Sequence, residues 1–140
     1  MNQFWKFMKY GYTIIYVEDV LTTLSFYEKA FGFERGMVYE EDGVVDYAEL
    51  KSGETTLGFA SHTTLGEMNF SGKYQKISPE GNPVGLELVF VDDNVEQATA
   101  HAVKNGAKLI APATEKPWGQ TVSYVRAIEG TLIEICSPMS

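Results

Sequence analysis

The alternation of apolar and polar positions along the chain predicts a βαβββ unit in the N-terminal half. A β-branched and aromatic run at 12–17 is typical of a strand. From 20 to 31, apolar residues recur at three- and four-residue spacing and predict an amphipathic helix, with Asp19 as its N-cap and Gly32 as its C-terminal stop. Further strands are expected at 33–39, 44–51 and 55–60, joined by turns at Asp42-Gly43 and Ser52-Gly53.

The same order of elements returns after a polar, glycine-bearing stretch. A strand is expected at 86–91, a helix from about 95 that ends at Asn105-Gly106, and strands at 108–111, 121–125 and 131–136. Tyr16 aligns with Phe90 and Gly32 with Gly106 at one offset of 74 residues (90 − 16 and 106 − 32). Such a repeat is typical of duplicated supersecondary units. We therefore expect one domain over 1–140, with module one at about 10–60, a linker loop at about 61–83 and module two at about 84–138.

Each module can cover only one face of its sheet with its single helix. The other face must pack against the second module, a partner chain or a ligand. The predicted fold class is therefore α+β, with two βαβββ modules forming an open mixed sheet that encloses a cleft. A homodimer is expected, and pairing of the modules within one chain or across two chains is left open.

Composition and charge exclude some classes of binding partner. The chain has 11 basic and 19 acidic residues and a formal net charge of −8, so it has no basic footprint for nucleic acid. No apolar run approaches the roughly 20 residues of a membrane span, so no membrane partner is expected. Cys136 is the only cysteine, which excludes an internal disulfide and favours a cytoplasmic location. We expect it to be a small buried residue.

Four segments resemble the vicinal oxygen chelate (VOC) superfamily, which includes glyoxalase I, extradiol dioxygenases, and fosfomycin and bleomycin resistance proteins. They are YTIIYVEDV at 12–20, SFYEKAFGFE at 25–34, KPWGQTVSYVR at 116–126 and GTLIEICSP at 130–138. The resemblance implies paired βαβββ modules around a U-shaped cleft, and often a homodimer. It implies no single activity, because this fold hosts lyases, dioxygenases, transferases and non-catalytic binders.

The resemblance also implies where a metal would be held. Metal-dependent members use His, Glu and Gln on the first and fourth strands of each module, and the strand patterns carry these positions onto Tyr12, Gly58, Leu86 and Glu134. Only Glu134 is a competent ligand, since a phenol with a pKa near about 10 binds divalent metals poorly. The sequence therefore predicts no catalytic metal and no cofactor.

The cleft positions instead suggest a pocket for an organic molecule. Strand alternation places Ile14 and Tyr16 on the face of Tyr12, with Leu86, Leu88 and Phe90 expected opposite, and such a lining is typical of ligand pockets. Gly58 would leave room for the ligand.

The resemblance places the 112–119 loop beside the cleft, with Trp118 as a stacking wall and Gln120 as a polar contact. Glu134 would lie at the cleft floor, either paired with Arg126 or Tyr12, or as an anchor for a cationic or hydroxylic ligand, or as a general base.

His62, at the start of the linker loop, is expected to be a solvated loop residue, with a position at the cleft rim as the alternative, and His101 on the second helix is expected to be structural or solvated. The favoured function is a glyoxalase/bleomycin-resistance-like protein that binds a small organic ligand, a cation being one option, without a catalytic metal. The alternatives are a metal-dependent glyoxalase-type lyase or extradiol-type dioxygenase, and a structural dimerisation module. The residues expected to contact the ligand are Tyr12, Ile14, Tyr16, Gly58, Leu86, Trp118, Gln120 and Glu134.

Overall fold

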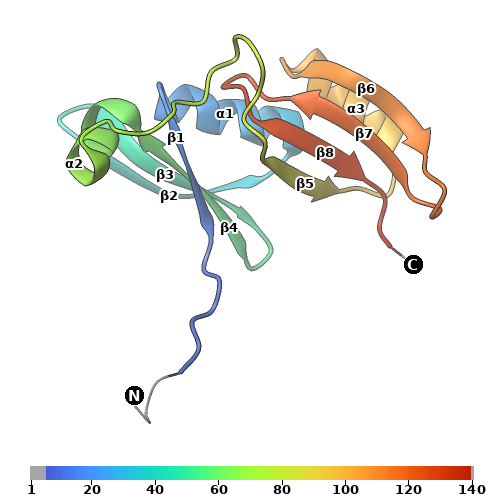
Figure 1. Ribbon diagram of the computed structural model, residues 1–140, viewed down its shortest axis with the longest axis horizontal. Helices are drawn as coiled ribbons and strands as arrows, with labels where there is room; N and C mark the ends of the chain where they lie inside the picture. Colours follow the sequence, from blue (N-terminus) through green and yellow to red (C-terminus); the bar gives the residue numbers. More distant parts are fainter. Residues whose placement is uncertain (1–5, 140) are drawn as a thin grey trace.

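The computed structural model describes residues 6–139, which form two four-stranded mixed sheets that each carry one long helix (Figure 1). Sheet one and its helix comprise β1 (Thr13–Val17), α1 (Val20–Phe31), β2 (Glu34–Glu41), β3 (Val44–Ser52) and β4 (Thr55–Ser61). Sheet two and its helix comprise β5 (Glu87–Val91), α3 (Val95–Lys104), β6 (Lys108–Glu115), β7 (Thr121–Arg126) and β8 (Leu132–Cys136). The strand orders, β1-β4-β3-β2 and β5-β8-β7-β6, are the same, so the predicted α+β fold class and the internal repeat are confirmed.

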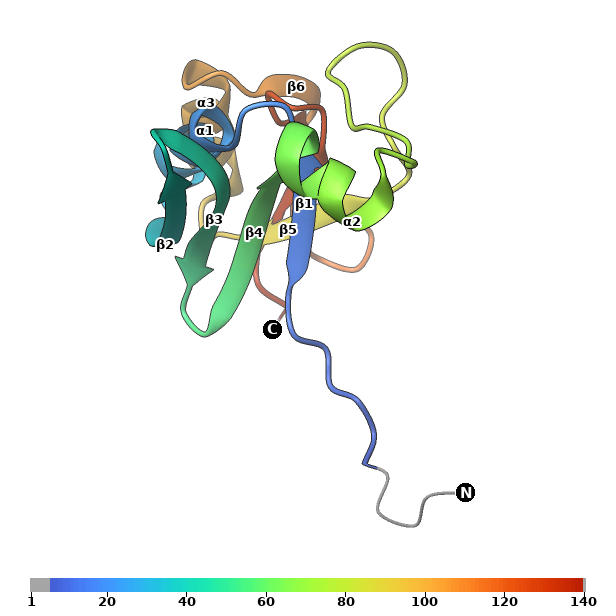
Figure 2. The ribbon, with the colours of Figure 1, turned by 90° about the vertical axis from the view of Figure 1, so that its left-hand side faces the viewer.

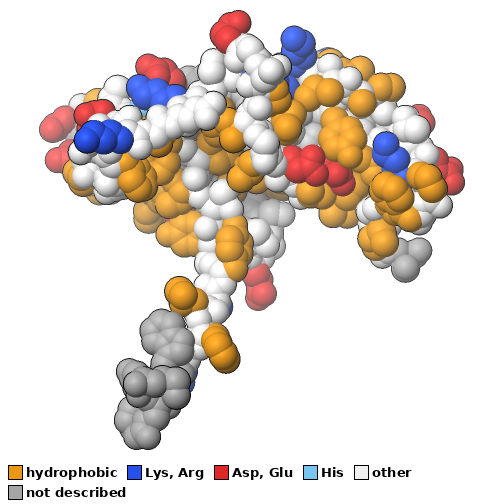
Figure 3. All heavy atoms as spheres, viewed as in Figure 1, with side chains coloured by type: hydrophobic (Ala, Val, Ile, Leu, Met, Phe, Trp, Pro, Cys, Tyr) orange, Lys and Arg blue, Asp and Glu red, His pale blue; other side chains and the backbone are white. Residues whose placement is uncertain are grey.

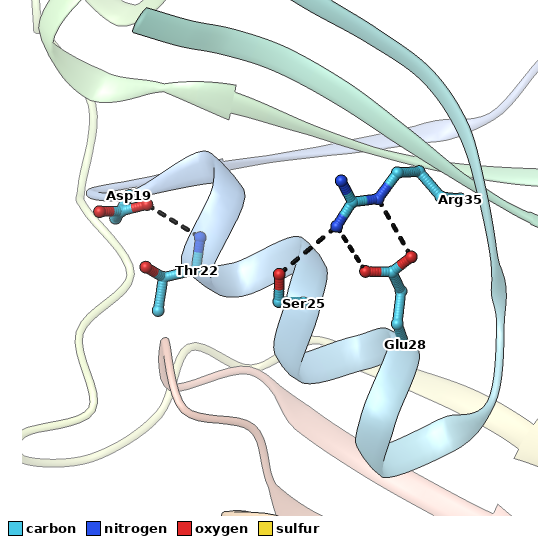
Figure 4. A network of polar contacts seen from close by, with 5 residues as sticks. All are labelled: Asp19, Thr22, Ser25, Glu28 and Arg35. Atoms are coloured by element: carbon cyan, nitrogen blue, oxygen red, sulfur yellow. Dashed lines mark hydrogen bonds and ion pairs between the residues drawn. The ribbon is translucent and has the colours of Figure 1, made fainter.

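Local sequence signals set the ends of α1. The Asp19 carboxylate accepts a hydrogen bond from the Thr22 N–H at 2.9 Å, as expected of an N-cap (Figure 4). Gly32 ends the helix with a φ of 77° and donates its N–H to the Glu28 carbonyl at 3.0 Å. Arg35 of β2 then binds the Glu28 carboxylate with two nitrogens, at 2.7 and 3.1 Å, which ties the helix to its own sheet.

The two helices lie side by side, and each covers one face of its own sheet (Figure 2). One continuous hydrophobic core joins both modules on the helix side. Its largest fully buried side chains include Tyr27, Phe59, Leu24, Leu50, Ile133, Val17 and Val125. We call the opposite face of each sheet, which carries no helix, its open face. No strand of sheet one pairs with a strand of sheet two within residues 6–139.

The register of β5 corrects the sequence alignment by one residue. Ile14 pairs with Gly58 on β1 and β4, and Val89 pairs with Glu134 on β5 and β8, so the first strands align at an offset of 75 (89 − 14). A shift of one residue exchanges the faces of a strand. Leu88 and Phe90 accordingly pack against the helix-side core and not on the open face where they were predicted. Leu86 lies exposed just before β5, outside the strand, where its N–H donates to the Val84 carbonyl at 2.7 Å.

The expected linker loop is partly helical. It begins with a five-residue π-helix, η1 (His62–Gly66), which continues into one turn of α-helix, α2 (Glu67–Phe70). The Ser61 hydroxyl caps η1 by accepting from the N–H groups of Thr64 and Leu65 at 3.3 Å each. β6 also differs from the prediction because it runs through Pro112, which an edge strand with an irregular register tolerates.

Arg126 holds the far end of the linker against module two. Its guanidinium donates to the carbonyls of Ser78 at 2.7 Å and Gly81 at 2.8 Å, and its Nε donates to Gly130 at 3.1 Å. Gly130 has a φ of 112°, and a Cβ at this position would lie 2.1 Å from the Ser78 carbonyl oxygen. The linker therefore passes directly over the β7–β8 turn.

No helix in the described part of the chain is both long and apolar enough to cross a membrane.

Candidate functional site

The open face of sheet one is rich in aromatic side chains. Tyr12, Ile14 and Tyr16 lie on it as predicted, and both Tyr12 and Ile14 are exposed. The room expected above Gly58 is occupied, because a Cβ at Gly58 would lie only 2.7 Å from the Tyr47 hydroxyl. Because Gly58 has no side chain, the Tyr47 ring can lie over β4 on this face. A ligand bound here would contact this ring.

Tyr47 is fixed as a hydrogen-bond donor on this face. Its hydroxyl donates to the Glu49 carboxylate at 2.7 Å. Burial, and next this carboxylate, raise the pKa of Tyr47 far above its ordinary value, so the phenol stays protonated at neutral pH. Lys51 lies 3.7 Å from Glu49, so the carboxylate is partly neutralised.

The linker adds an aromatic wall at the C-terminal end of β1. The rings of Tyr16, Phe70 and Tyr74 lie 5.5 to 5.8 Å apart, and Asn69 donates to the Tyr16 hydroxyl at 3.0 Å. These distances are typical of favourable edge-to-face aromatic packing. The three rings therefore form one packed cluster at this end of the open face.

His62 supports this wall, and the prediction that it is a solvated loop residue is wrong. Its side chain is only 3% exposed, and its Nδ1 lies 2.6 Å from the Tyr74 hydroxyl. Burial, and then the charge of Lys76, lower the pKa of His62, which favours a neutral imidazole that shares this hydrogen bond with the Tyr74 hydroxyl. The residue is buried because η1 turns it back under the linker.

His101 on α3 is exposed, as expected, and its Nε2 lies 2.8 Å from the Lys29 carbonyl.

The open face of sheet two brings two carboxylates together. Glu87 and Glu134 lie on this face of the adjacent strands β5 and β8, and Tyr124 of β7 pairs directly with Glu134. Burial, and then Glu134, raise the pKa of Glu87. Burial and the same two carboxylates raise the pKa of Tyr124. Figure 3 shows acidic side chains among hydrophobic ones over this part of the surface. The arrangement favours a cation, because a positive charge relieves the repulsion between the carboxylates.

Sequence reasoning missed Glu87 because of the one-residue shift in β5. No spacing in the sequence gives the offset of 75 that finds it, because Gly32 and Gly106 are 74 residues apart (106 − 32) and Gly58 and Glu134 are 76 apart (134 − 58), so only the pairing of β5 with β8 does so. The predicted pairing of Glu134 with Arg126 or Tyr12 is also wrong. Arg126 binds main-chain carbonyls, as described above, and the neighbours of Glu134 are Glu87, Tyr124 and Cys136.

Trp118 and Gln120 lie at the C-terminal end of β8. Trp118 is 62% exposed, and its indole N–H donates to the Gln120 side chain at 2.8 Å. Gln120 in turn donates to the Ser137 carbonyl at 2.8 Å, just after β8. Gly119, with a φ of 96°, makes the tight turn that presents the indole. The chain thus holds a large, rigid, exposed aromatic ring at the end of β8.

Cys136 is buried between these groups. Burial, and then Glu134, raise the pKa of the Cys136 thiol, so a thiolate nucleophile is disfavoured. The residue is the small buried side chain that its sequence context predicted.

The predicted site residues therefore fall into two groups. Tyr12, Ile14, Tyr16 and Gly58 lie on sheet one, whereas Glu134, Trp118 and Gln120 lie on or beside sheet two. No hydrogen bond joins the two groups within residues 6–139.

A metal site of the kind implied by the resemblance does not fit these residues. With the corrected register, the four positions hold Tyr12, Gly58, Glu87 and Glu134, so both carboxylates come from one sheet and the other sheet offers a phenol and a glycine. Among residues 6–139 there is no group of three or more His, Cys, Asp and Glu side chains arranged to hold a metal ion. Catalytic centres commonly use at least three such protein ligands.

Comparison with known proteins places the chain in a family. The model of the glyoxalase-like domain matches residues 10–140. The chain belongs to this family. No curated protein matches the chain in a sequence search.

Similar solved structures support the same fold. A glyoxalase/bleomycin resistance protein/dioxygenase family enzyme from Burkholderia phytofirmans has a TM-score of 0.75 at 20% identity, covering 92% of this chain and 98% of that one. TioX from Micromonospora sp. ML1 has a TM-score of 0.70 at 19% identity, covering 94% and 100%. A superfamily member from Sphaerobacter thermophilus has a TM-score of 0.68 at 19% identity, covering 94% and 98%. This chain, as a member of the glyoxalase-like family, therefore also belongs to the VOC superfamily that the sequence resemblance indicated.

Proposed function

We propose that this glyoxalase-like protein binds a small organic cation without a catalytic metal, with the carboxylates of Glu87 and Glu134 as the anchor. The observation that carries the proposal is that these two carboxylates lie together on neighbouring strands of one open sheet face beside the Tyr124 ring, while Arg126 of the same face binds main-chain carbonyls. Carboxylates and aromatic faces are the groups that proteins use together to hold ammonium ligands.

Trp118 and Tyr124 are the proposed aromatic contacts. Trp118 is exposed and oriented by Gln120, so its face is available for stacking without a change in the loop. Lys116 lies 6.0 Å from the centroid of the Tyr124 ring, which supports the idea that this ring can receive a cation. The ligand would displace the lysine ammonium and neutralise the carboxylate pair.

Sheet one supplies the second wall in this proposal. Tyr12, Ile14 and Tyr16, with the Tyr47 ring over Gly58, would cover the apolar part of the ligand in an inter-module cleft. The facing sheet would come from the same chain or from the second chain of a homodimer. We expect the protein to act in the cytoplasm, with neither nucleic acid nor membrane as a partner.

The test is a binding titration with benzyltrimethylammonium and with benzyl alcohol as the uncharged counterpart. We expect the cation to bind roughly tenfold more tightly, or better, because only the cation gains the carboxylate contacts. Glu134→Gln should remove this preference, whereas Glu115→Gln on the exposed edge strand β6 should keep it. Equal binding of both compounds, or a preference that survives Glu134→Gln, would reject the proposal.

A second candidate is the metal-dependent lyase or dioxygenase. The corrected register puts Glu87 in place of Leu86, so the implied positions hold two carboxylates where the sequence predicted one, which is still fewer than the three ligands that such centres commonly use. Elemental analysis after dialysis against zinc, nickel, manganese and iron decides between the candidates. One equivalent of metal that is lost in Glu134→Gln would establish a metal site and overturn the metal-free proposal.

A further inference from the structure

A hollow of about 580 Å³ lies between the two modules on the helix side of the sheets. Its lining comes from both modules, namely from the C-terminal end of α1, the end of the β3–β4 hairpin, β5 and α3. Proteins bind small organic molecules in hollows of this size, which form preferentially where two structural units meet. Glu87, Glu134 and Trp118 lie outside its lining, so the hollow is separate from the site proposed above.

Three phenylalanine rings, which we call the phenylalanine floor, line this hollow. The ring centroids of Phe31 and Phe33 lie 4.9 and 4.8 Å from that of Phe90, with the ring planes at 68° and 86°. All three rings pack against the core and are only half-buried, so part of each ring surface remains available in the hollow. A further aromatic ring placed there would continue this edge-to-face packing.

His101 of α3 supplies a hydrogen-bond acceptor to the same lining. Its Nε2 lies 2.8 Å from the Lys29 main-chain carbonyl, and because a carbonyl oxygen can only accept, Nε2 carries the proton. Asn105 Nδ2 lies farther from this nitrogen, at 3.3 Å, and donates to the His101 main-chain carbonyl at 2.8 Å. A neutral imidazole protonated on Nε2 has an acceptor at Nδ1. No hydrogen bond joins this Nδ1 to another of the residues 6–139.

The charged residues of the lining disfavour an acidic ligand. Asp92 follows β5 and places a carboxylate there, which accepts from the Asn94 N–H at 2.8 Å. Lys51 also lines the hollow, but its ammonium donates to Thr56 at 2.9 Å and lies 3.7 Å from the Glu49 carboxylate. An anionic ligand would therefore approach Asp92 with the nearby ammonium already engaged. A neutral hydroxyl meets no such repulsion and can donate to the imidazole.

We propose that this hollow is a second binding site, which takes a neutral aromatic molecule with a phenolic hydroxyl. The ring of the ligand packs on the phenylalanine floor, and its hydroxyl donates to His101 Nδ1. The ligand contacts both modules, because Phe31 and Phe33 belong to module one whereas Phe90 and His101 belong to module two. The proposal does not rest on the cation site, because the two sites share no residue.

Isothermal titration calorimetry of the full-length chain at about pH 8 tests the ligand class. 4-Ethylphenol should bind at least roughly fivefold more tightly than 4-ethylanisole, whose methyl ether lacks the donor, and more tightly than the anion 4-ethylbenzoate. His101→Leu, at an exposed helix position, should remove the preference for the phenol over the anisole, and His101→Gln should restore part of it because an amide oxygen also accepts. Equal binding of the phenol and the anisole, or a preference that survives His101→Leu, would overturn the proposal.

A steric block locates the site. Gln97 is exposed on α3 and lines the hollow, so Gln97→Trp should fill the opening and weaken binding of 4-ethylphenol at least roughly tenfold. The matched control is Ala100→Trp, at an exposed position of the same helix outside the hollow, which should leave binding unchanged. Glu134→Gln should also leave it unchanged, because that carboxylate lies on an open sheet face. Phenol binding that survives Gln97→Trp, or that is lost in Glu134→Gln, contradicts binding in this hollow.

Discussion

Glu129 is a largely buried carboxylate whose replacement by glutamine should stabilise the protein. The Tyr27 hydroxyl, fully buried on α1, donates to Glu129 Oε2 at 2.6 Å and so joins the two modules. The other carboxylate oxygen, Oε1, is buried without a hydrogen-bond partner, and so is the Thr131 hydroxyl. Burial raises the pKa of Glu129 against the opposing effect of the hydrogen bond from Tyr27.

The expected magnitude follows from these contacts. Glu129→Gln keeps an oxygen to accept the Tyr27 proton, removes the buried charge, and offers an N–H to the Thr131 hydroxyl. An unpaired buried polar group costs about 1–3 kcal/mol, so we expect a gain of about 1–2 kcal/mol near neutral pH. For a domain of this size, that corresponds to a rise in Tm of about 3–8 °C.

The gain should depend on pH, with a sign set by the raised pKa. Below the unfolded-state pKa, both states hold the Glu129 proton and the carboxyl costs little. As pH rises above that value, the unfolded state loses its proton first, so wild-type stability falls until the folded-state pKa is passed. The difference between Glu129→Gln and wild type should therefore be small near about pH 4 and largest near about pH 8.

Urea unfolding followed by circular dichroism at several pH values measures this difference. Glu115→Gln on the exposed edge strand serves as the control and should shift the midpoint little at any pH. Tyr27→Phe, which removes the donor to Glu129, should destabilise the protein more at high than at low pH. A Glu129→Gln protein that is no more stable than wild type at about pH 8, or a gain that does not change with pH, would refute the reasoning.

Three further substitutions test the local arguments. Gly58→Ala should cost about 1–3 kcal/mol in urea unfolding because its Cβ would lie 2.7 Å from the Tyr47 hydroxyl, and Tyr47→Ala in the same chain should relieve part of the cost. Gly130→Ala should be at least as costly, because the Ser78 carbonyl is main chain and the φ is 112°; a change below about 1 kcal/mol would contradict this. Asp19→Ala should cost about 1 kcal/mol through loss of the N-cap, and Asp19→Asn should restore most of it in thermal denaturation.

Elements set by neighbouring residues were predictable from the sequence. The N-cap at Asp19 and the stop at Gly32 depend on contacts within a few residues, and the structure confirms both. The turn at Asp42-Gly43 is also confirmed, with φ values of 52° and 79° that suit a two-residue hairpin. Repetition of the whole pattern made the two-module fold predictable even though no single motif specifies it.

Features set by distant residues were less predictable. The run at 86–91 is apolar at every position except Glu87, so alternation could not fix which face each side chain takes, and only the pairing with β8 does so. His62 is buried because Tyr74, 12 residues later, folds back onto it, and the polar composition of the intervening segment gave no sign of this contact. The Tyr47 ring fills the space over Gly58 from the neighbouring strand of the same hairpin, and strand alternation alone does not show that a side chain crosses to a position on the next strand.

The hydrogen bonds from Arg126 to the linker place few limits on the side chains of that segment. The guanidinium binds the carbonyl oxygens of Ser78 and Gly81, which every amino acid possesses, so the contact is indifferent to the side chains at 78–81. The specificity resides instead in the β7–β8 turn, where Arg126 donates these hydrogen bonds and Gly130, without a side chain, lets the Ser78 carbonyl approach. Side-chain changes at 78–81 should therefore be tolerated, while Arg126 and Gly130, about 50 residues away (126 − 78 = 48 and 130 − 78 = 52), decide whether the linker stays bound to module two.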